Sequence, residues 1–331
     1  MQQSTAINPI SKQQSITIQL LKGIAILCVI LAHTCPRGTT AVIFRPWLNS
    51  SVPLFIFLSA FLTRIEGRNW YAFYKKRIIR VVIPYVIWTV FYCLQAGDID
   101  RLHVNLLTSS SAGHLYYIFV YVQLVLLTPL FAMLARSKFK YNFLIWIISP
   151  IFVACYIYIP LITGKPVDGY LYVICSNICL GFILYFYLGL LLGNRIIDKK
   201  FSVNLLAILF VAAVVLQIGE AYILMKVGSG DPGNPGLTNV LTSFCCCLLA
   251  YAILERGGFK KCNKFLVLLG NYSFGLYLSH VLVKRILQTT TFYDSIPYIA
   301  NSALVLLISL FICYVGDKVL GKRISRWLGF R

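Results

Sequence analysis

Long apolar runs separated by short polar links make up most of the chain. Ten of the runs approach or reach the length of about 20 residues that a helix needs to cross the hydrocarbon core of a bilayer. They lie at residues 18–36, 49–63, 81–96, 113–134, 142–162, 170–193, 203–225, 237–254, 265–287 and 298–320. Because no link between them exceeds about twenty residues, we expect one all-α domain, a polytopic membrane helix bundle of about ten transmembrane helices.

Polar segments flank this apolar region at both ends. Residues 1–17 are expected to form a polar cytoplasmic N-terminal segment rather than a signal peptide, because the first apolar run is followed by many more. The transmembrane domain is expected at 18–321, followed by a basic cytoplasmic tail at 322–331. The chain is thus predicted to be an integral membrane protein with both termini on one side.

Composition supports the membrane class. Hydrophobic residues make up 59% of the 331 residues and charged residues only 12%, with a mean hydropathy of +0.79. A soluble domain usually carries about 25% charged residues. So little polar surface could not cover so large an apolar content in water, whereas lipid-facing positions in a bilayer stay apolar without cost.

The basic charge of the chain predicts its orientation. With the N-terminus inside, 23 of the 30 Lys and Arg residues fall on the inner side of the spans and 7 on the outer side. Lys and Arg accumulate in cytoplasmic loops, where they also meet anionic lipids. The net charge of +20 therefore predicts cytoplasmic termini. We expect no nucleic-acid partner, because no extended basic run is interleaved with aromatic residues.

Two polar residues lie on one face of the first span. Lys22 is at its inner end and His33 follows eleven residues later, which is about 16 Å along a helix and nearly the same face. Charged and titratable groups are costly within a membrane and mark functional sites. A cation near the inner surface and a titratable base in the outer half fit a path through the bilayer.

The other histidines and outer charges supply further candidates. His280 is expected at about the depth of His33, and His114 nearer the outer surface, so that three of the four histidines gather in the outer half. The fourth, His103, lies in a polar loop and is expected to be solvated. Glu220 lies within a late span, where pairing with a cation such as Lys284 or Arg285 is favoured over a part in substrate handling.

The first span resembles that of the acyltransferase-3 family of membrane acyltransferases. The family's span reads approximately Asp-x-Leu-Arg-Gly, with ten residues between the Arg and a His. Lys22, Gly23 and His33 occupy the corresponding positions, whereas Gln19 stands where the Asp is expected and Lys22 replaces the Arg. Lys keeps the charge of Arg but loses its bidentate fork.

Further matches follow along the chain in the family's order. In the second span, the segment from Pro53 to Phe61 ends in Ser59-Ala60-Phe61, where the family has Ser-Gly-Phe/Tyr. The other matches are the basic start of the third span at 73–85, the aromatic start of the fourth span at 114–117, and the Ser-x-Gly-x-Tyr-x-x-His element at 273–280. The resemblance is dispersed from about residue 18 to 285. Each match is short, and their shared order gives the resemblance its specificity.

The resemblance implies a bacterial cytoplasmic-membrane enzyme. Such an enzyme would move an acyl group, typically acetyl, from cytoplasmic acyl-CoA to a hydroxyl of a cell-surface polysaccharide or its lipid-linked precursor. His33 would act as general base, since an imidazole can take a proton near neutral pH. No catalytic metal is expected.

Other residues are assigned by role. Cations at the inner mouth would hold the donor's phosphates by charge-assisted hydrogen bonds; they are Lys22, Lys76, Arg77 and Arg80. The remaining site candidates are His280, His114 and Ser59, with Arg37 and Arg45 on the acceptor side. A covalent acyl-enzyme through Ser59 or Cys35 would need a base and an orienting acid, and the sequence offers no such set.

Two other classes explain part of the sequence. A transporter or flippase of a glycan or lipid-linked intermediate would explain the intramembrane charges, and inverted repeats with paired broken helices would favour it. A membrane scaffold or sensor would explain the hydropathy but gives Lys22 and His33 no role. Acyl transfer is therefore the leading hypothesis.

Overall fold

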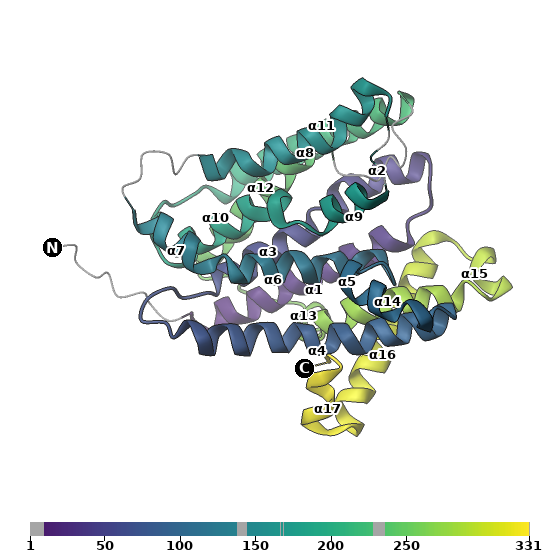
Figure 1. Ribbon diagram of the computed structural model, residues 1–331. Coiled ribbons are helices and arrows are strands. Elements are labelled where there is room, and N and C mark those ends of the chain that lie inside the picture. Colours follow the sequence, from purple (N-terminus) through teal and green to yellow (C-terminus); the bar gives the residue numbers. More distant parts are fainter. Residues whose placement is uncertain (1–9, 138–143, 166, 168, 228–235, 331) are drawn as a thin grey trace.

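The computed structural model describes residues 10–137, 144–165, 167, 169–227 and 236–330. Every regular element within these ranges is a helix, and none of the described residues forms a strand (Figure 1). The α-helices are α1 (Lys12–Thr34), α2 (Thr39–Leu48), α3 (Ser51–Phe61), α4 (Trp70–Ala96), α5 (Leu102–Thr108), α6 (Tyr116–Leu126), α7 (Thr128–Arg136), α8 (Leu144–Thr163), α9 (Gly169–Asn177), α10 (Ile183–Gly193), α11 (Val203–Lys226), α12 (Leu237–Glu255), α13 (Lys264–Asn271), α14 (Ser273–Leu287), α15 (Thr291–Ser295), α16 (Tyr298–Val319) and α17 (Gly321–Trp327). Short 3₁₀ turns lie at η1 (Ile99–Arg101), η2 (Gly113–Leu115) and η3 (Cys179–Phe182).

The predicted bundle of about ten membrane spans is confirmed. Among the described residues, eight helical segments are long and apolar enough to cross a bilayer, and two bent helix pairs raise the total to as many as ten. The first pair joins 99–126 to α7 with a 47° bend, and the second joins α13 to α14 with an 81° bend. The sequence predicted both pairs as single spans, because a bend does not change the apolar pattern.

Local capping extends the first span beyond its apolar run. The Ser11 hydroxyl accepts a hydrogen bond from the Gln14 backbone (3.1 Å), and the Gln14 side chain accepts one from the Ser11 backbone (2.9 Å). This capping box starts α1 at Lys12, within the segment predicted to be a polar extension. Residues 1–9 of that segment lie outside the described residues.

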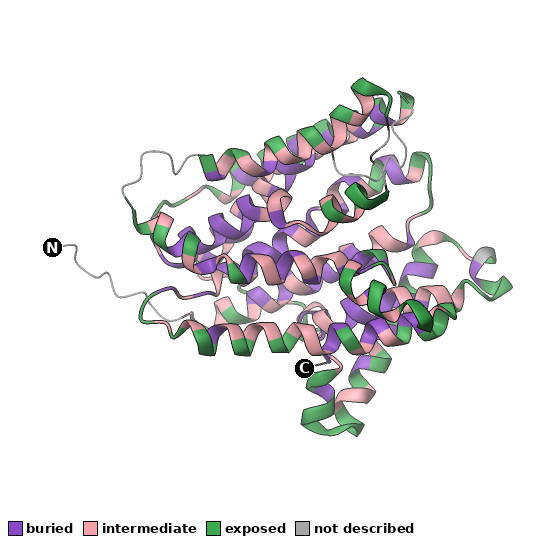
Figure 2. Cartoon of the chain, viewed as in Figure 1, coloured by how far each residue is buried: buried purple, intermediate pink, exposed green. Residues whose placement is uncertain are grey.

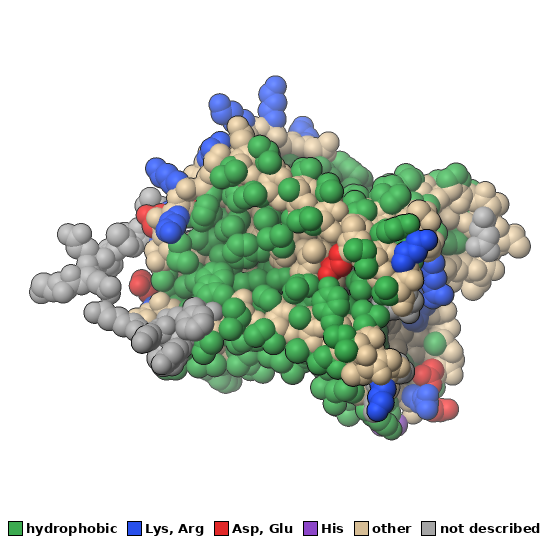
Figure 3. Space-filling model, turned by 90° about the horizontal axis from the view of Figure 1, so that it is seen from above, with side chains coloured by type: hydrophobic (Ala, Val, Ile, Leu, Met, Phe, Trp, Pro, Cys, Tyr) green, Lys and Arg blue, Asp and Glu red, His purple; other side chains and the backbone are tan. Residues whose placement is uncertain are grey.

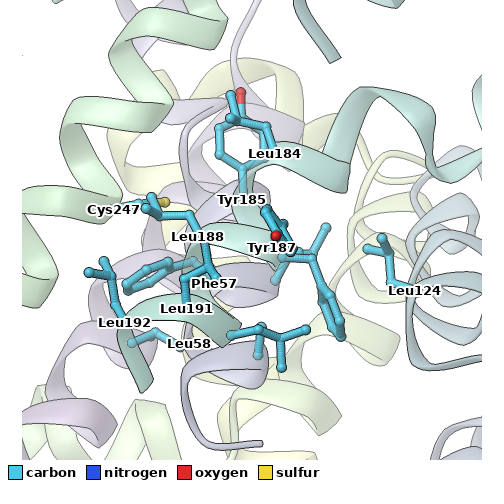
Figure 4. Packing of buried hydrophobic residues seen from close by; sticks show 14 of the residues in the cluster. Phe57, Leu58, Leu124, Leu184, Tyr185, Tyr187, Leu188, Leu191, Leu192 and Cys247 are labelled. Carbon is cyan, nitrogen blue, oxygen red and sulfur yellow. The ribbon is translucent and has the colours of Figure 1, made fainter. Parts of the chain in front are cut away.

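The core lies around α10. All eleven of its residues are buried, as expected of a helix that is hydrophobic on every side. Figure 4 shows Tyr185, Leu188 and Leu191 of α10 among Phe57 of α3 and Cys247 of α12. Figure 2 shows that buried residues concentrate in the middle of the bundle, whereas α8, α11 and α17 are largely exposed or intermediate.

Exposed hydrophobic side chains identify the lipid-facing surface. Examples are Ile162, Ile208, Leu216 and Phe311, which expose 58–83% of their surface on α8, α11 and α16. In Figure 3 hydrophobic side chains cover most of one face, and Lys and Arg lie mainly toward its edges. Such a belt would be a large exposed patch in water but is the normal boundary with lipid.

The closest backbone approach that bears on the site joins α1 to α13. A Cβ added at Gly23 would lie 1.9 Å from the Leu266 carbonyl oxygen, and one added at Gly270 would lie 1.8 Å from the Gln19 carbonyl oxygen. Only glycine leaves room for this crossing. Immediately after Gly270 the chain bends by 81° into α14, so the crossing sets the origin and direction of the helix that carries His280.

The expected pairing of Glu220 with Lys284 or Arg285 is wrong. The Glu220 carboxylate accepts hydrogen bonds from the backbone of Leu237 (2.9 Å) and Thr238 (3.0 Å), and also from the hydroxyls of Thr238 and Tyr158. It therefore occupies the N-terminus of α12, where unpaired N–H groups attract an anion.

The C-terminal residues fold back onto the bundle. The Trp88 indole donates to the Leu328 carbonyl oxygen (3.0 Å), and Phe330 is only 4% exposed. The basic helix α17 precedes this contact and projects beside α4 (Figure 1). The segment predicted as a basic tail thus contributes packing contacts, and its cytoplasmic location stays a prediction.

We predict that Gly23→Ala destabilises the protein. The added methyl group would force α1 and α13 apart, and overpacking of this kind costs at least about 1–3 kcal/mol. The measurement is the thermal unfolding midpoint of the purified protein in detergent. Gly219→Ala is the matched control, because Gly219 is helical and exposed, with nothing within 4 Å of an added Cβ. Equal midpoints for the two variants would contradict the prediction.

Candidate active site

Three histidines from distant parts of the chain meet in the bundle. His33 is next to last in α1, His114 lies in η2 and His280 lies in α14. The ring centroids of His33 and His280 are 5.1 Å apart, those of His114 and His280 5.0 Å, and those of His33 and His114 5.9 Å. We call these residues the histidine cluster. His103, in contrast, lies on α5 and is exposed.

The backbone fixes the hydrogen position on His280. Its Nδ1 lies 3.0 Å from the carbonyl oxygen of Leu276 and 2.8 Å from that of Tyr277. Because a carbonyl oxygen only accepts, we assign the hydrogen of a neutral ring to Nδ1. The lone pair is then on Nε2, which is buried and has no hydrogen-bond partner in the described structure. The Nε2 atom of His280 can therefore accept a hydrogen bond. The ring lies close to those of His33 and His114, but no described hydrogen bond joins it to either.

His33 is the most accessible member of the histidine cluster. It is partly exposed, whereas His114 and His280 expose 2% and 0% of their surface. Lys284 of α14 donates a hydrogen bond from Nζ to the His33 carbonyl oxygen (2.5 Å), which ties the end of α1 to α14. His33 is thus the only member of the histidine cluster that the protein does not bury completely.

Tyrosines surround the histidine cluster. The His114 ring lies 5.1 Å from the Tyr277 ring and 5.5 Å from the Tyr92 ring, measured between centroids. The Tyr277 hydroxyl donates to the His114 carbonyl oxygen, and the Tyr117 ring lies 5.3 Å from the Tyr277 ring. These contacts build a mostly aromatic wall beside the imidazoles, of which both nitrogens of His114 and Nε2 of His280 have no described hydrogen-bond partner.

A basic cavity approaches this wall from one end of the bundle. Its volume is about 520 Å³, within the range of sites for small molecules and cofactors. Five cations from α1, α4 and the link before α4 line it, and they are Lys22, Arg68, Lys76, Arg77 and Arg80. The described lining residues include no Asp or Glu, so the basic cavity is suited to a ligand with several negative charges.

Ser59 belongs to the basic cavity rather than to the histidine cluster. The Arg77 guanidinium donates to the Ser59 hydroxyl (2.9 Å) and to the Tyr121 hydroxyl (3.2 Å). A guanidinium cannot accept the Ser59 proton. The described contacts of the Ser59 hydroxyl thus include no base that could activate it as a nucleophile.

The basic cavity ends beside the histidine cluster. Val29, which lines it, is one helical turn before His33 on α1. Tyr117 and Tyr277 also line it, and the Tyr277 ring contacts the ring of His114. None of the lining residues is a histidine, so the aromatic wall of Tyr117 and Tyr277 separates the basic cavity from the three imidazoles.

Two smaller cavities adjoin the histidine cluster from other directions. The first, which we call the outer cavity, has a volume of about 490 Å³ and is lined by residues that include Thr34, Arg37 and Lys284. The second, the side cavity, has a volume of about 380 Å³ and is lined by residues that include Tyr92 and Arg285. The outer cavity includes Thr34, which follows His33 in the sequence. The side cavity includes Tyr92, whose ring contacts the ring of His114.

The sequence identified much of this arrangement. The three histidines, the four predicted donor-binding cations and Arg37 all lie in or beside the cavities. Arg45 lies in α2 and is not among the described residues that line the outer cavity.

Sequence reasoning did not identify Arg68, Tyr117, Tyr277 or Lys284 as site residues. Arg68 resembles any other positive-inside cation, whereas Tyr117 and Tyr277 each lie three residues from a histidine of the cluster. That spacing places side chains on neighbouring parts of one helical turn, and it is the signal that could have found them.

No described group of three or more His, Cys, Asp or Glu residues has an arrangement that could hold a metal ion. The chemistry that the described side chains offer is proton transfer and anion binding. An unprotonated imidazole nitrogen can take a proton from a hydroxyl group, and Lys and Arg side chains can bind phosphate groups.

The fold and cavities define an integral membrane protein with a cavity lined by cations next to a cluster of three histidines. The sequence profile of the acyltransferase-3 family, described as an acyltransferase domain, matches residues 16–317. The match covers most of the 331 residues, and the chain belongs to this family. It is therefore a membrane acyltransferase. No curated protein and no solved structure matches the chain.

Family membership decides against the transporter hypothesis. The two bent helix pairs are a feature that transporters also use. Here the bend between α13 and α14 brings His280 to His33, and the family is one of acyltransferases. The broken helices are therefore no evidence for transport in this chain.

Proposed function

We propose that the protein transfers an acetyl group from acetyl-CoA to a hydroxyl of a cell-surface polysaccharide or its lipid-linked precursor. The observation that carries the proposal is the position of the histidine cluster between the basic cavity and the outer cavity. Donor and acceptor would approach the cluster from these two cavities. We further propose that the basic end faces the cytoplasm of a bacterial cell, as the positive-inside rule predicts.

The basic cavity supports acyl-CoA as the donor. CoA carries several phosphate charges at one end and a thioester at the end of a long flexible arm. Lys22, Arg77 and Arg80 would hold the phosphates, while the arm extends along α1. Lys22 and His33 are separated by about 16 Å along that helix, so the thioester would arrive at the aromatic wall and not at the cations.

His33 would act as general base and then as general acid. Its ring takes the proton of the acceptor hydroxyl as the oxygen attacks the thioester carbonyl carbon. The carbon–sulfur bond breaks, the new ester forms, and the thiolate of CoA takes the proton back from His33. Atoms and charge balance without a covalent acyl-enzyme, in keeping with the engagement of Ser59 by Arg77.

Reaction of the thioester requires passage of the aromatic wall. Tyr277 holds its position through one hydrogen bond to the His114 carbonyl oxygen and through ring contacts with Tyr117 and His114. A side-chain rotation of Tyr277 would connect the basic cavity to the histidine cluster. Between substrates the closed wall would keep water and ions from passing through the bundle.

His280 would position His33. The centroid separation of 5.1 Å allows a ring rotation to bring an N–H of His33 to the lone pair on His280 Nε2. That hydrogen bond would leave the other nitrogen of His33 free to accept the hydroxyl proton. His280 itself keeps its orientation because two backbone carbonyl groups hold Nδ1.

We predict that His33→Ala lowers the turnover number by a factor of about 10²–10⁴, the usual contribution of a general base. The measurement is transfer of labelled acetyl from acetyl-CoA to glycan by the purified protein. His103→Ala, which changes the exposed histidine of α5, should retain activity. A folded His33→Ala protein with undiminished transfer would remove His33 from the mechanism.

We predict that Arg77→Gln combined with Arg80→Gln weakens CoA binding by at least about tenfold, since each lost charge-assisted hydrogen bond costs about 1.5–3 kcal/mol. Direct titration of the purified protein with CoA measures this. Lys260→Gln combined with Lys261→Gln removes the same charge from exposed residues that do not line the basic cavity. If both double variants bind CoA equally, the cations serve topology alone.

We predict that His280→Leu lowers the turnover number by about 10²-fold with little change in the KM for acetyl-CoA. His280→Gln should retain more activity, because its amide oxygen can accept the hydrogen bond from His33. Steady-state kinetics of both variants, with thermal unfolding as a check on folding, provide the test. Equal losses in the two variants would indicate that His280 acts by packing and not by accepting this bond.

A further inference from the structure

Lys284 is an intramembrane cation without a described counter-anion. It lies on α14, within a helix pair apolar enough to span the membrane, where an ionisable side chain normally has a partner or a function. Its hydrogen bond to the His33 carbonyl oxygen uses one of three ammonium hydrogens. None of the described ion pairs includes Lys284, and Glu220 is occupied at the N-terminus of α12.

The outer cavity beside Lys284 carries an excess of positive charge. Lys284 and Arg37 both line it, and the described lining residues include no Asp or Glu. Arg37 also takes part in none of the described ion pairs. An anionic group in this cavity would supply the missing partner and gain charge-assisted hydrogen bonds.

The rest of the lining suits a sugar better than an acyl chain. Gln288 contributes an amide, and Asn301 contributes its amide oxygen, because its nitrogen already donates to the carbonyl oxygens of Tyr293 and Ile296. Tyr293 and Tyr298 contribute rings, and the Tyr298 hydroxyl donates to the Leu31 carbonyl oxygen. Amides pair with hydroxyl groups, and tyrosine combines an apolar face with a polar tip. The volume of about 490 Å³ is within the range of pockets for small ligands. The expected occupant is therefore polar, rich in hydroxyls and anionic.

We infer that the outer cavity binds an acidic sugar of the acceptor, with Lys284 and Arg37 holding its negative group. This inference rests on the proposed function for the role of the sugar as acceptor. Lys284 contacts the backbone of His33, so a sugar whose acid group is held there lies beside the proposed base. The same cation thus selects the acceptor by its charge and places a neighbouring hydroxyl near His33.

The side cavity provides a contrast within the same helix. It is lined by Arg285, the residue after Lys284, but also by Asp98, so its two charges offset each other. Arg285 additionally contacts the Gln95 side chain and the Tyr92 ring. Replacing Arg285 by a neutral residue therefore removes one positive charge, as replacing Lys284 does, but leaves the lining of the outer cavity unchanged.

The test is direct binding of defined saccharides to the purified protein in nanodiscs of neutral phosphatidylcholine. A trisaccharide of galacturonic acid is compared with the matching neutral trisaccharide of galactose by calorimetric titration. We expect the acidic trisaccharide to bind more tightly, with an affinity that falls as salt is raised. Lys284→Gln and Arg37→Gln should each weaken acidic binding by at least about tenfold. Arg285→Gln should bind as the wild type does, and Lys284→Arg, which keeps the charge, should retain more acidic binding than Lys284→Gln.

Binding and transfer separate this inference from the proposed function. Equal affinity for the two trisaccharides, or an effect of Arg285→Gln as large as that of Lys284→Gln, would overturn the inference even if acetyl transfer is observed. If phosphatidylglycerol added to the nanodisc abolishes saccharide binding, the outer cavity is instead a site for lipid headgroups. Failure of any acetyl transfer, with acidic binding intact, would reject the enzyme mechanism but leave the binding site. Unchanged CoA affinity of Lys284→Gln checks that this variant is folded.

Discussion

The close crossing of α1 and α13 is the constraint on which the site depends. Gly23 and Gly270 let the two backbones approach so closely that no Cβ fits at either position. The chain then bends by 81° and continues as α14, which brings His280 to within 5.1 Å of His33 between ring centroids. The glycine that follows Lys22 in the sequence is therefore explained by packing, and the packing determines which imidazoles meet.

Polar groups inside the bundle divide into those that the fold satisfies and those that it leaves for ligands. Glu220 is satisfied by the N-terminus of α12. Lys284 and the imidazole nitrogen of His280 are incompletely satisfied. Because unpaired polar groups are costly away from water, the incompletely satisfied groups are the ones to which we assign substrate binding and proton transfer in the proposed function.

Two cavities with positive linings lie on either side of a histidine cluster that carries no carboxylate among its described contacts. In the proposed reaction, cations would bind the anionic part of each substrate, and the imidazoles would transfer the proton where the substrates meet. Binding energy from remote groups can then position the reacting atoms, which is an effective way to lower the barrier of a two-substrate reaction.

The sequence by itself determined the membrane class, a count of about ten spans and the family, and it predicted most of the residues that the structure brings together around the cavities. Hydropathy does so because lipid requires continuous apolar helices, and the spacing of Lys22 and His33 puts both on one helical face. Only the tertiary structure decided that α13 and α14 are sharply bent, that Ser59 belongs with Arg77, that Glu220 caps a helix and that Lys284 faces a cavity. These outcomes depend on which helix faces meet, and contacts between distant segments leave no periodic pattern in one chain.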